Sequence, residues 1–423
     1  MVALGQQRRL AGTGSPSLCV FGYNVGMSVL APLVIGYALV GCAWWLWILV
    51  GSIRVARAVP VLARVDPPRP AAWPRLSLVV AACNEADHVE SAVTSILRED
   101  YPDLEVVLVD DRSSDGTGAI ADRLATADDR LRVLHVTELP TGWLGKVHAL
   151  ARGAEAARGE WILFTDADVH FAPGTLRRAV AFAVQRGVDH VAAIPDIWPS
   201  APVVDAVTAM FLRTFPVVTR CWAIEDPASP AFIGIGAFNL VRREALERSE
   251  GFEWLRLEVG DDMGLGLLLK RSGARCCLVS GAGLVGLYWY RNLGEMARGL
   301  EKAYASVGRC SLARMVAAGI VVTALEWAPF VMLASPGVPG LPPGLWLAGV
   351  VMLVAVAIVA VVQRRTPGQP RIGPILLSPV AALVSLVLTV RSGWLGWRRG
   401  GVLWRGTLYE SRALRAGRRI RFP

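Results

Sequence analysis

The chain of 423 residues is unusually apolar for its length. Hydrophobic residues make up 53% of it, charged residues make up 19%, and the mean hydropathy is +0.43. These values exclude a disordered chain, a collagen-like chain and an ordinary soluble enzyme. We therefore expect part of the chain to lie in a lipid bilayer.

The positive charge is concentrated at one end of the chain. The formal net charge is +9, and the nine arginines and one glutamate of residues 391–423 account for +8 of it. A basic segment beside apolar stretches and tryptophans favours anionic lipid headgroups over nucleic acid as its partner. The same segment indicates topology, because basic loops stay on the cytosolic side of a membrane.

The first membrane segment is predicted at residues 32–53, where 22 apolar or small residues follow one another. As a helix this segment is about 33 Å long, which is enough for one crossing. Arg54, Arg57 and Arg64 follow it directly. The positive-inside rule therefore places the next domain in the cytosol and makes residues 1–72 an N-terminal membrane anchor.

Three further apolar stretches are predicted to form a C-terminal membrane region, at residues 315–333, 344–362 and 372–390. Four complete crossings would leave the basic tail, residues 391–423, outside the cell, against the positive-inside rule. The first stretch contains Pro329 and the last contains Pro374 and Pro379, and prolines kink or break helices. We therefore predict that one of these two stretches does not fully cross and that the tail is cytosolic.

The middle of the chain, residues 73–290, has the composition of a globular domain. Short β-type runs alternate there with helical segments, and we predict strands at residues 75–82, 104–111, 131–137 and 161–168. This alternation is typical of βαβ units, so the predicted fold class is α/β with a mainly parallel sheet and helices on both faces. Ligands of such sheets bind beyond the carboxyl ends of the strands.

Polar side chains follow three of the predicted strands: Asn84 and Glu85, Asp110 and Asp111, and Asp166 and Asp168. Asp166 and Asp168 stand two residues apart, so both carboxylates leave the chain on the same side. Such a pair can hold Mg²⁺ or Mn²⁺ and leave positions for phosphate oxygens. No GxGxxG sequence follows the first strand, which argues against a dinucleotide-binding dehydrogenase. We therefore favour a metal and diphosphate site here over a set of solvated loop acids.

Six segments, in their order and spacing, resemble the successive motifs of glycosyltransferase family 2: VVAACNEADHV, VLVDDRSSDGT, GWLGK, FTDADVHF, GIGAFNLVRREALERSEGF and VGDDMGLGLLLKRSG. The resemblance implies the GT-A fold, a nucleotide-diphospho-sugar transferase domain with a Rossmann-like mixed sheet. The membrane segments and the WRGTLY string at Trp404 further resemble membrane-anchored members that glycosylate lipids such as hopanoids and carotenoids.

The resemblance implies a role for each residue at the strand ends. Asn84 and Glu85 would form the nucleotide-binding turn, and Asp111 would read the base. Asp166 would lie beside the ribose and the metal, and Asp168 would coordinate Mg²⁺ or Mn²⁺. The chemistry is suitable, because a carboxylate accepts hydrogen bonds from a base N–H or a ribose hydroxyl. The cation would neutralise the departing diphosphate.

The resemblance also makes Asp262 the general base and gives Asp261 a supporting role. An acceptor hydroxyl that attacks the anomeric carbon needs one carboxylate to take its proton, and a single displacement inverts the configuration. The alternative is that the two acids only stabilise the start of the helix that follows, since acids favour helix N-termini. Gly236 is expected to line the sugar and acceptor cleft.

Three cationic residues are candidates for contact with the donor. Lys146 follows a glycine that permits close backbone approach. One hypothesis is that Lys146 contacts the nucleotide or diphosphate of the donor, and the alternative is that it is a solvated surface lysine. Arg298 and Lys302 lie four residues apart on a helix predicted within residues 291–314, and both could cover the departing diphosphate. An amphipathic interfacial helix explains these two residues nearly as well.

These observations predict a multi-pass, inverting glycosyltransferase of the bacterial inner membrane with its catalytic domain in the cytosol. It would transfer one sugar from a nucleotide donor, a UDP-sugar by family frequency, to a lipid acceptor in the inner leaflet. A processive polysaccharide synthase is one alternative, although the QxxRW motif of processive members is absent. The other alternative is a non-catalytic membrane scaffold with a nucleotide-binding domain.

Overall fold

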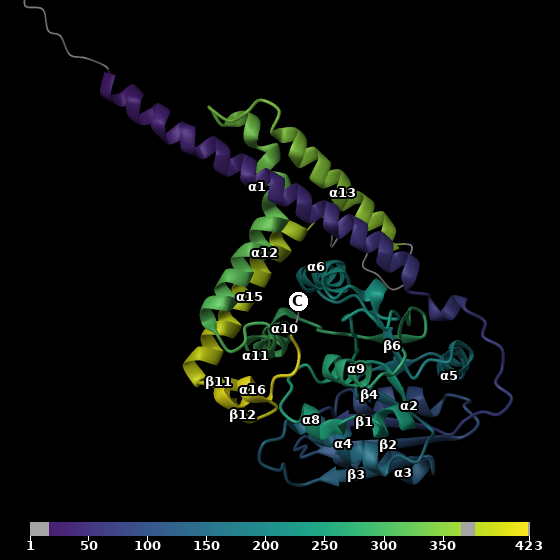
Figure 1. Cartoon of the computed structure of the whole chain (residues 1–423). Helices are drawn as coiled ribbons and strands as arrows, with labels where there is room; N and C mark the ends of the chain where they lie inside the picture. The colour runs from purple at the N-terminus through teal and green to yellow at the C-terminus, as the bar shows by residue number, and fades with distance from the viewer. Residues whose placement is uncertain (1–16, 365–376, 422–423) are drawn as a thin grey trace, which may run out of the picture.

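The computed structural model describes residues 17–364 and 377–421. It has two parts, a mixed α/β domain and a bundle of long apolar helices (Figure 1). Helix α1 (Ser17–Ala58) runs from the bundle to the domain, and α15 (Ser378–Arg399) runs from the bundle to a small C-terminal hairpin. The chain therefore connects the helix bundle to the rest of the molecule both near the start and near the end of the described residues.

A seven-stranded sheet of order β3-β2-β1-β4-β8-β6-β9 forms the centre of the α/β domain. Its strands are β1 (Leu76–Ala82), β2 (Leu104–Asp111), β3 (Leu131–Val136), β4 (Trp161–Asp166), β6 (His190–Ile194), β8 (Asn239–Arg242) and β9 (Cys276–Ser280). Strands β1 to β4 are mutually parallel where they pair, and β8 is antiparallel to both of its neighbours. The four predicted strands and the mixed α/β sheet are confirmed.

Helices cover both faces of this sheet: α2 (Val89–Leu97), α3 (Thr117–Ala127), α4 (Gly145–Ala156), α5 (Thr175–Arg186), α7 (Arg243–Glu247), α8 (Gly251–Leu255) and α9 (Asp261–Arg271). Successive strand residues point to opposite faces. Leu78 and Val80 therefore pack with α2 and α5, whereas Val79 belongs to the core formed with α4 and α9. Because both faces are buried, β1 is apolar apart from Ser77, as is typical of parallel sheets.

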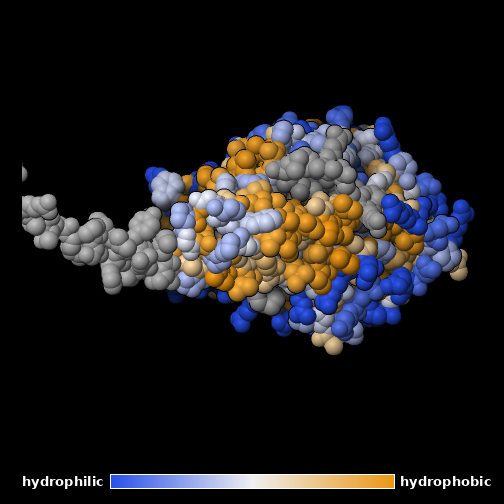
Figure 2. Space-filling view, turned by 90° about the horizontal axis from the view of Figure 1, so that it is seen from above, coloured by the Kyte–Doolittle hydropathy of each residue, from blue (hydrophilic) through white to orange (hydrophobic). Residues whose placement is uncertain are grey.

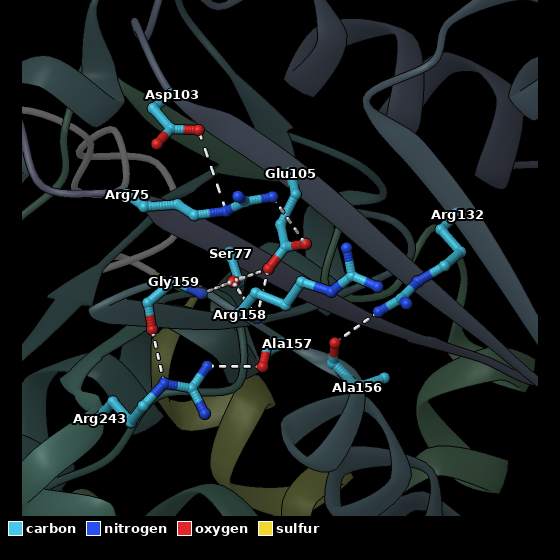
Figure 3. A network of polar contacts seen from close by, with 10 residues as sticks. All are labelled: Arg75, Ser77, Asp103, Glu105, Arg132, Ala156, Ala157, Arg158, Gly159 and Arg243. Carbon is cyan, nitrogen blue, oxygen red and sulfur yellow. Dashed lines mark hydrogen bonds and ion pairs between the residues drawn. The ribbon is translucent and has the colours of Figure 1, made fainter.

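A polar network closes the edge of the sheet at which the parallel strands begin (Figure 3). Ser77 at the start of β1 donates to Glu105 at the start of β2 and accepts from Gly159 N at 2.7 Å. Arg243 reaches the same loop and donates to Gly159 O at 2.7 Å and to Ala157 O at 2.6 Å. These bonds fix the strand starts and leave the carboxyl ends open.

The segment predicted as one interfacial helix, residues 291–314, is a series of short turns. It contains α10 (Leu293–Gly299), the 3₁₀ turn η3 (Leu300–Lys302) and α11 (Ala303–Ser306). Arg309 and Cys310 then have φ angles of 51° and 54°, in the left-handed region. A right-handed helix cannot continue through such residues, so the prediction of a single helix is wrong here. A small sheet formed by β5 (His170–Phe171), β10 (Val285–Leu287) and β7 (Asp196–Ile197) precedes this segment.

Within the described residues, five helices are long and apolar enough to cross a membrane: Leu30–Ala58 of α1, Pro202–Ala223, which contains α6 (Pro202–Val218), α12 (Leu312–Leu333), Trp346–Gln363 of α13 (Trp346–Arg364), and α15. Four of them correspond to the predicted apolar stretches. The fifth is the helix that contains α6, and half of its apolar window is buried within the molecule. Figure 2 shows the hydrophobic surface that these helices form, with hydrophilic residues around it.

The prolines do not interrupt the described helices. Pro329 lies inside α12, which is continuous from Leu312 to Leu333. Pro379 lies in the first turn of α15. Backbone N–H groups in the first turn of a helix have no acceptor within the helix, so the N–H that proline lacks costs no helical hydrogen bond. Pro374 lies outside the described residues. Helix α15 continues to Arg399, past the predicted end at residue 390, because Arg391 donates to Ala297 O of α10 at 2.8 Å. The incomplete crossing and the domain boundaries stay predictions.

A buried ion pair joins the bundle to the domain. Nη2 of Arg213 in α6 lies 2.5 Å from Oε2 of Glu326 in α12, and both side chains are at most 2% exposed. The same guanidinium donates to Ser378 Oγ of α15 at 3.2 Å and lies 5.1 Å above the ring of Trp45 in α1. Four long helices therefore meet at one arginine.

Candidate functional site

One pocket opens at the carboxyl ends of β1, β2 and β4, with an empty volume of about 750 Å³ that includes space open to solvent. Its lining residues come from the strand ends, α4, η3 and the C-terminal segment: Ala81, Ala82, Cys83, Glu85, Asp111, Arg112, Gly145, Lys146, Ala149, Asp166, Ala167, Asp168, Lys302, Trp404, Arg405 and Tyr409. This is the edge at which the sequence predicted a ligand.

Asn84 and Glu85 form the turn after β1, but only Glu85 lines the pocket. Asn84 has a φ of 56° and accepts a hydrogen bond from Ser114 N at 2.8 Å. The backbone of Glu85 donates to Thr117 Oγ1 at 2.8 Å. Asn84 therefore shapes the turn, and Glu85 presents its carboxylate to the pocket.

Asp111 ends β2 and is held by its neighbour Arg112, whose Nε lies 2.7 Å from Oδ1 and whose Nη2 lies 3.0 Å from Oδ2. Helix α4 begins directly beside this pair. A Cβ on Gly145 would lie 2.4 Å from Asp111 Oδ2 and 2.5 Å from Arg112 Nη2. A side chain at Gly145 would displace the Asp111–Arg112 pair, so the glycine lets α4 start beside this pair and carry Lys146 into the pocket.

Lys146 lies between two carboxylates. Its Nζ is 2.8 Å from Asp166 Oδ1 and 3.0 Å from Asp261 Oδ2. Burial alone would lower the pKa of Lys146, but Asp166, Asp261 and Asp262 raise it well above its usual value, so the ammonium stays charged. Burial, opposed by Lys146, raises the pKa of Asp261 to about 6. The alternative of a solvated surface lysine is wrong, because this side chain connects α4, β4 and α9.

Asp166 and Asp168 both face the pocket. Burial, followed by the charges of Asp166 and Glu85, raises the pKa of Asp168 to about 7. Burial acts in the same direction on Asp166, but the nearby Lys146 lowers its pKa overall. Two carboxylates beside a diphosphate would match the mixed protein and phosphate coordination that Mg²⁺ prefers. In the described residues, no group of three or more His, Cys, Asp or Glu side chains gathers around a metal position.

Asp262 lies beside the pocket and not in its lining. Its Oδ2 accepts from Gly236 N at 3.0 Å, and its Oδ1 accepts from Met263 N at 2.8 Å. A Cβ on Gly234 would lie 1.7 Å from Asp262 O, and one on Gly236 would lie 2.7 Å from Asp166 Oδ2. The glycine loop therefore fits tightly between the two acids. This contact places Gly236 at the junction of the pocket and Asp262.

The C-terminal hairpin is a part of the site that the sequence analysis missed. Strands β11 (Gly401–Trp404) and β12 (Thr407–Glu410) are joined by Arg405 and Gly406, whose φ angles of 48° and 78° suit a tight two-residue turn. Arg405 donates to Cys83 O at 2.7 Å and pairs with Glu85. The WRGTLY string was the available signal, but we had assigned residues 391–423 to lipid headgroups.

Two further contacts hold the hairpin at the pocket. Gly145 N donates to the hydroxyl of Tyr409 at 3.1 Å, and Lys302 Nζ lies 5.6 Å from the ring centre of Trp404. Lys302 therefore lines the pocket, whereas Arg298 is exposed on α10 and does not line it. The two residues are separated because α10 ends at Gly299 and a 3₁₀ turn follows.

Comparison with known proteins shows what this domain is similar to. Residues 77–249 match the family model described as glycosyl transferase family 2. The chain is 34% identical over 118 residues to the uncharacterized glycosyltransferase EpsJ of Bacillus subtilis, which is 28% of this chain and 33% of that protein. It is 32% identical over 118 residues to the GalNAc(5)-diNAcBac-PP-undecaprenol beta-1,3-glucosyltransferase of Campylobacter jejuni, covering 28% of this chain and 37% of that protein. The matches thus span about a third of these relatives' length.

Among solved structures, the mannosyltransferase PcManGT from Pyrobaculum calidifontis, in complex with GDP-Man and Mn²⁺, superposes with a TM-score of 0.51. The two chains are 21% identical, and the superposition covers 84% of this chain and 98% of that one. At this identity the similarity concerns the fold. The predicted GT-A fold is therefore confirmed.

Proposed function

Since residues 77–249 form a glycosyl transferase family 2 domain with the GT-A fold, we propose that the chain is an inverting glycosyltransferase. It transfers one sugar from a nucleotide diphosphate donor to a membrane lipid. The observation that carries this proposal is the meeting of Glu85, Asp111, Lys146, Asp166 and Asp168 in one pocket at the carboxyl edge of the sheet.

The pocket offers groups for each part of the donor. Asp111 is proposed to accept from the base, and Asp166 from the ribose. Lys146 and Lys302 supply positive charge for the diphosphate, which their place in the lining supports. Asp168 with Asp166 would hold Mg²⁺ or Mn²⁺, which when bound neutralises charge on the diphosphate. The PcManGT complex with GDP-Man and Mn²⁺ supports a nucleotide sugar and a divalent cation here, and we propose a UDP-sugar as the donor.

Asp262 is proposed to take the proton of the acceptor hydroxyl. The hydroxyl oxygen then forms a bond to the anomeric carbon while the bond from that carbon to the diphosphate breaks, so the configuration inverts. Gly236 N holds one carboxylate oxygen of Asp262 at 3.0 Å, which orients the base beside the donor pocket. Asp261 is turned toward Lys146 and is proposed to keep that ammonium in place. No role in covering the diphosphate is proposed for Arg298.

The acceptor is proposed to be a lipid of the inner leaflet. A hydrophobic acceptor is met where it dissolves, and five helices of the described chain are apolar and long enough to cross a membrane. The Campylobacter relative is named for an acceptor linked to undecaprenol diphosphate, which supports the same class of substrate. Arg54 and Arg57 at the end of α1 favour a cytosolic catalytic domain in a multi-pass protein of the inner membrane.

A donor screen tests the proposal. Purified full-length protein is incubated with labelled nucleotide sugars, Mg²⁺ or Mn²⁺, and a bacterial lipid extract, and the products are extracted into organic solvent. We expect one donor to yield a lipid that carries a single sugar. A polymeric product would instead indicate a processive synthase. Donor binding without turnover in the presence of the extract would indicate a scaffold.

A further inference from the structure

An open groove beside α11 shares none of its lining residues with the donor pocket. It is formed by α11, the start of α12, the last turns of α15 and the C-terminal helix α16 (Ser411–Gly417). Its lining residues are Tyr304, Cys310, Ser311, Leu312, Ala313, Val316, Ala317, Ile320, Trp397 and Arg415. The side chains are thus mostly apolar, and the groove ends at one arginine.

The apolar part of the groove is open to its surroundings. Ile320 is 54% exposed and Trp397 is 63% exposed, although both belong to helices that are long enough to cross a membrane. Exposed apolar side chains arranged along two adjacent helices favour contact with hydrocarbon over contact with water. This part of the groove therefore suits an acyl chain.

The other end of the groove carries an excess of positive charge. Arg415 lines it, and Arg309 and Arg314 flank the start of α12. Burial, followed by the charge of Arg309, lowers the pKa of Arg418 against the opposing charge of Glu258, and Arg314 and Arg421 act in the same direction as Arg309, so these charged groups lie close together. In the part of the chain that the structure describes, Arg309, Arg314 and Arg415 form no ion pair.

Other arginines of the basic tail are already occupied. Arg391 and Arg399 pair with Glu301 at 2.9 Å and 2.6 Å, and Arg405 pairs with Glu85 in the donor pocket. The unpaired charge is therefore confined to the arginines around this groove and a few exposed positions. Glu258 lies near Arg418, whereas Arg309, Arg314 and Arg415 have no ion-pair partner among the described residues. Their planar guanidinium groups match phosphate oxygens in pairs, so they are available for an external anion.

We propose that this groove binds one anionic phospholipid of the cytosolic leaflet. Its phosphate lies between Arg314 and Arg415, and an acyl chain follows Val316, Ile320 and Trp397. The inference rests on the proposed membrane orientation and concerns a site separate from the donor pocket. Because α16 follows β12 directly, the bound lipid would hold the C-terminal segment at the membrane surface.

Native mass spectrometry of the full-length protein in detergent tests the phosphate end. Phosphatidylglycerol or phosphatidylcholine is titrated into wild type, into Arg314→Gln/Arg415→Gln, and into the control Arg57→Gln/Arg412→Gln. The control removes the same charge from two exposed arginines that form no ion pair in the described chain. We expect the Arg314/Arg415 variant to bind one phosphatidylglycerol roughly tenfold more weakly than wild type and the control to stay near wild type. Equal phosphatidylglycerol affinity in all three proteins, or equal affinity of wild type for both lipids, would overturn the proposal.

Fluorescence quenching tests the apolar end. Phosphatidylglycerol with a brominated acyl chain is added to wild type and to Trp397→Phe. We expect part of the quenching to disappear in the variant, and identical fractional quenching in both proteins would contradict the placement of the chain. Neither experiment needs a sugar donor. If the protein transfers sugar but fails these tests, only the proposed lipid site is rejected. If it binds lipid at this groove without transferase activity, only the proposed function is rejected.

Discussion

At the scale of single residues, Gly236 lies against the Asp166 carboxylate of the pocket. A Cβ there would lie 2.7 Å from Asp166 Oδ2 and 3.5 Å from Lys146 Nζ. We expect Gly236→Ala to displace the Asp166 carboxylate and to lower the transfer rate by roughly a hundredfold, because small displacements in a reacting site have effects of this size. The measurement is the initial rate of sugar transfer at saturating donor.

The matched control for this substitution is Gly36→Ala. A Cβ on Gly36 has no neighbour within 4 Å, and this glycine lies in α1, far along the chain from the pocket. The control should transfer sugar at the wild-type rate. If Gly236→Ala also does so, the close contact between the glycine loop and Asp166 has no role in the reaction.

Glu99 determines part of the pH dependence of stability. Its buried carboxylate accepts from Thr175 N at 3.2 Å and Leu176 N at 3.3 Å at the start of α5. Burial raises its pKa from 4.5 to about 7. The folded protein therefore retains a proton that the unfolded chain releases, so this group stabilises the fold fully below pH 4.5 and loses that effect as the pH rises through 7.

We expect the melting temperature in detergent to fall between pH 5 and pH 7.5 for this reason. The glutamine in Glu99→Gln is neutral at every pH, so the melting temperature of this variant should fall less between pH 5 and pH 7.5. Glu138→Gln, at an exposed position, should show the same fall as wild type. Thermal unfolding followed by tryptophan fluorescence at several pH values measures the effect. An unchanged pH dependence in Glu99→Gln would show that the carboxylate is ionised in the folded protein.

At the scale of elements, the hairpin of β11 and β12 completes the donor pocket. Arg405 reaches Glu85 and Cys83 O from the turn of the hairpin. We expect Arg405→Gln to weaken donor binding about tenfold or more, since a charge-assisted hydrogen bond contributes ~1.5–3 kcal/mol. Isothermal titration with the donor nucleotide measures this. Arg412→Gln, an exposed change just after the hairpin, should bind as wild type does, and equal affinity of both variants would remove Arg405 from the site.

The elements that could be predicted from the sequence are those with local signals. The runs that form β1, β2 and β4 are mostly apolar, and the acids at or after their ends lie at one edge because parallel strands end together. The contact between Arg405 and Glu85 joins residues far apart in the chain, and no periodicity indicates it. The break after α11 was missed because left-handed φ angles at Arg309 and Cys310 are unusual for non-glycine residues.

The basic tail, residues 391–423, is another case in which contacts between distant residues could not be predicted from the sequence. The charge of residues 391–423, beside apolar segments and tryptophans, suggested headgroup binding, but a composition does not reveal intramolecular partners. In the structure Val402, Leu414 and Ile420 are buried in the core that α4 and α9 share, so much of this segment is part of the α/β domain's packing. The charge was located correctly, and its partners had to be found in three dimensions.

At the scale of the whole molecule, the ion pair of Arg213 and Glu326 connects the α/β domain's α6 with the helix bundle. Removing one member leaves a buried charge without a partner, which costs ~3–5 kcal/mol. We expect Arg213→Met and Glu326→Leu each to lower the melting temperature strongly and the double variant to recover much of the loss. Thermal unfolding in detergent measures this.

The control for these single and double variants is the exposed ion pair of Arg186 and Glu225, in which Arg186 Nη2 lies 2.6 Å from Glu225 Oε2. Exposed ion pairs contribute little, so Arg186→Met should leave the melting temperature nearly unchanged. If the Arg213 and Glu326 single variants are as stable as wild type, the ion pair does not hold the domain to the bundle.

The central claim is that the pocket and Asp262 together transfer a sugar to a lipid. The most direct measurement is the transfer of label from the nucleotide sugar to extractable lipid, by wild type and Asp262→Asn in parallel, with donor binding measured on the same samples. We expect Asp262→Asn to bind donor as wild type does and to transfer ~10²–10⁴-fold more slowly, with Asp129→Asn, an exposed change, at the wild-type rate. Wild-type transfer by Asp262→Asn would contradict the account.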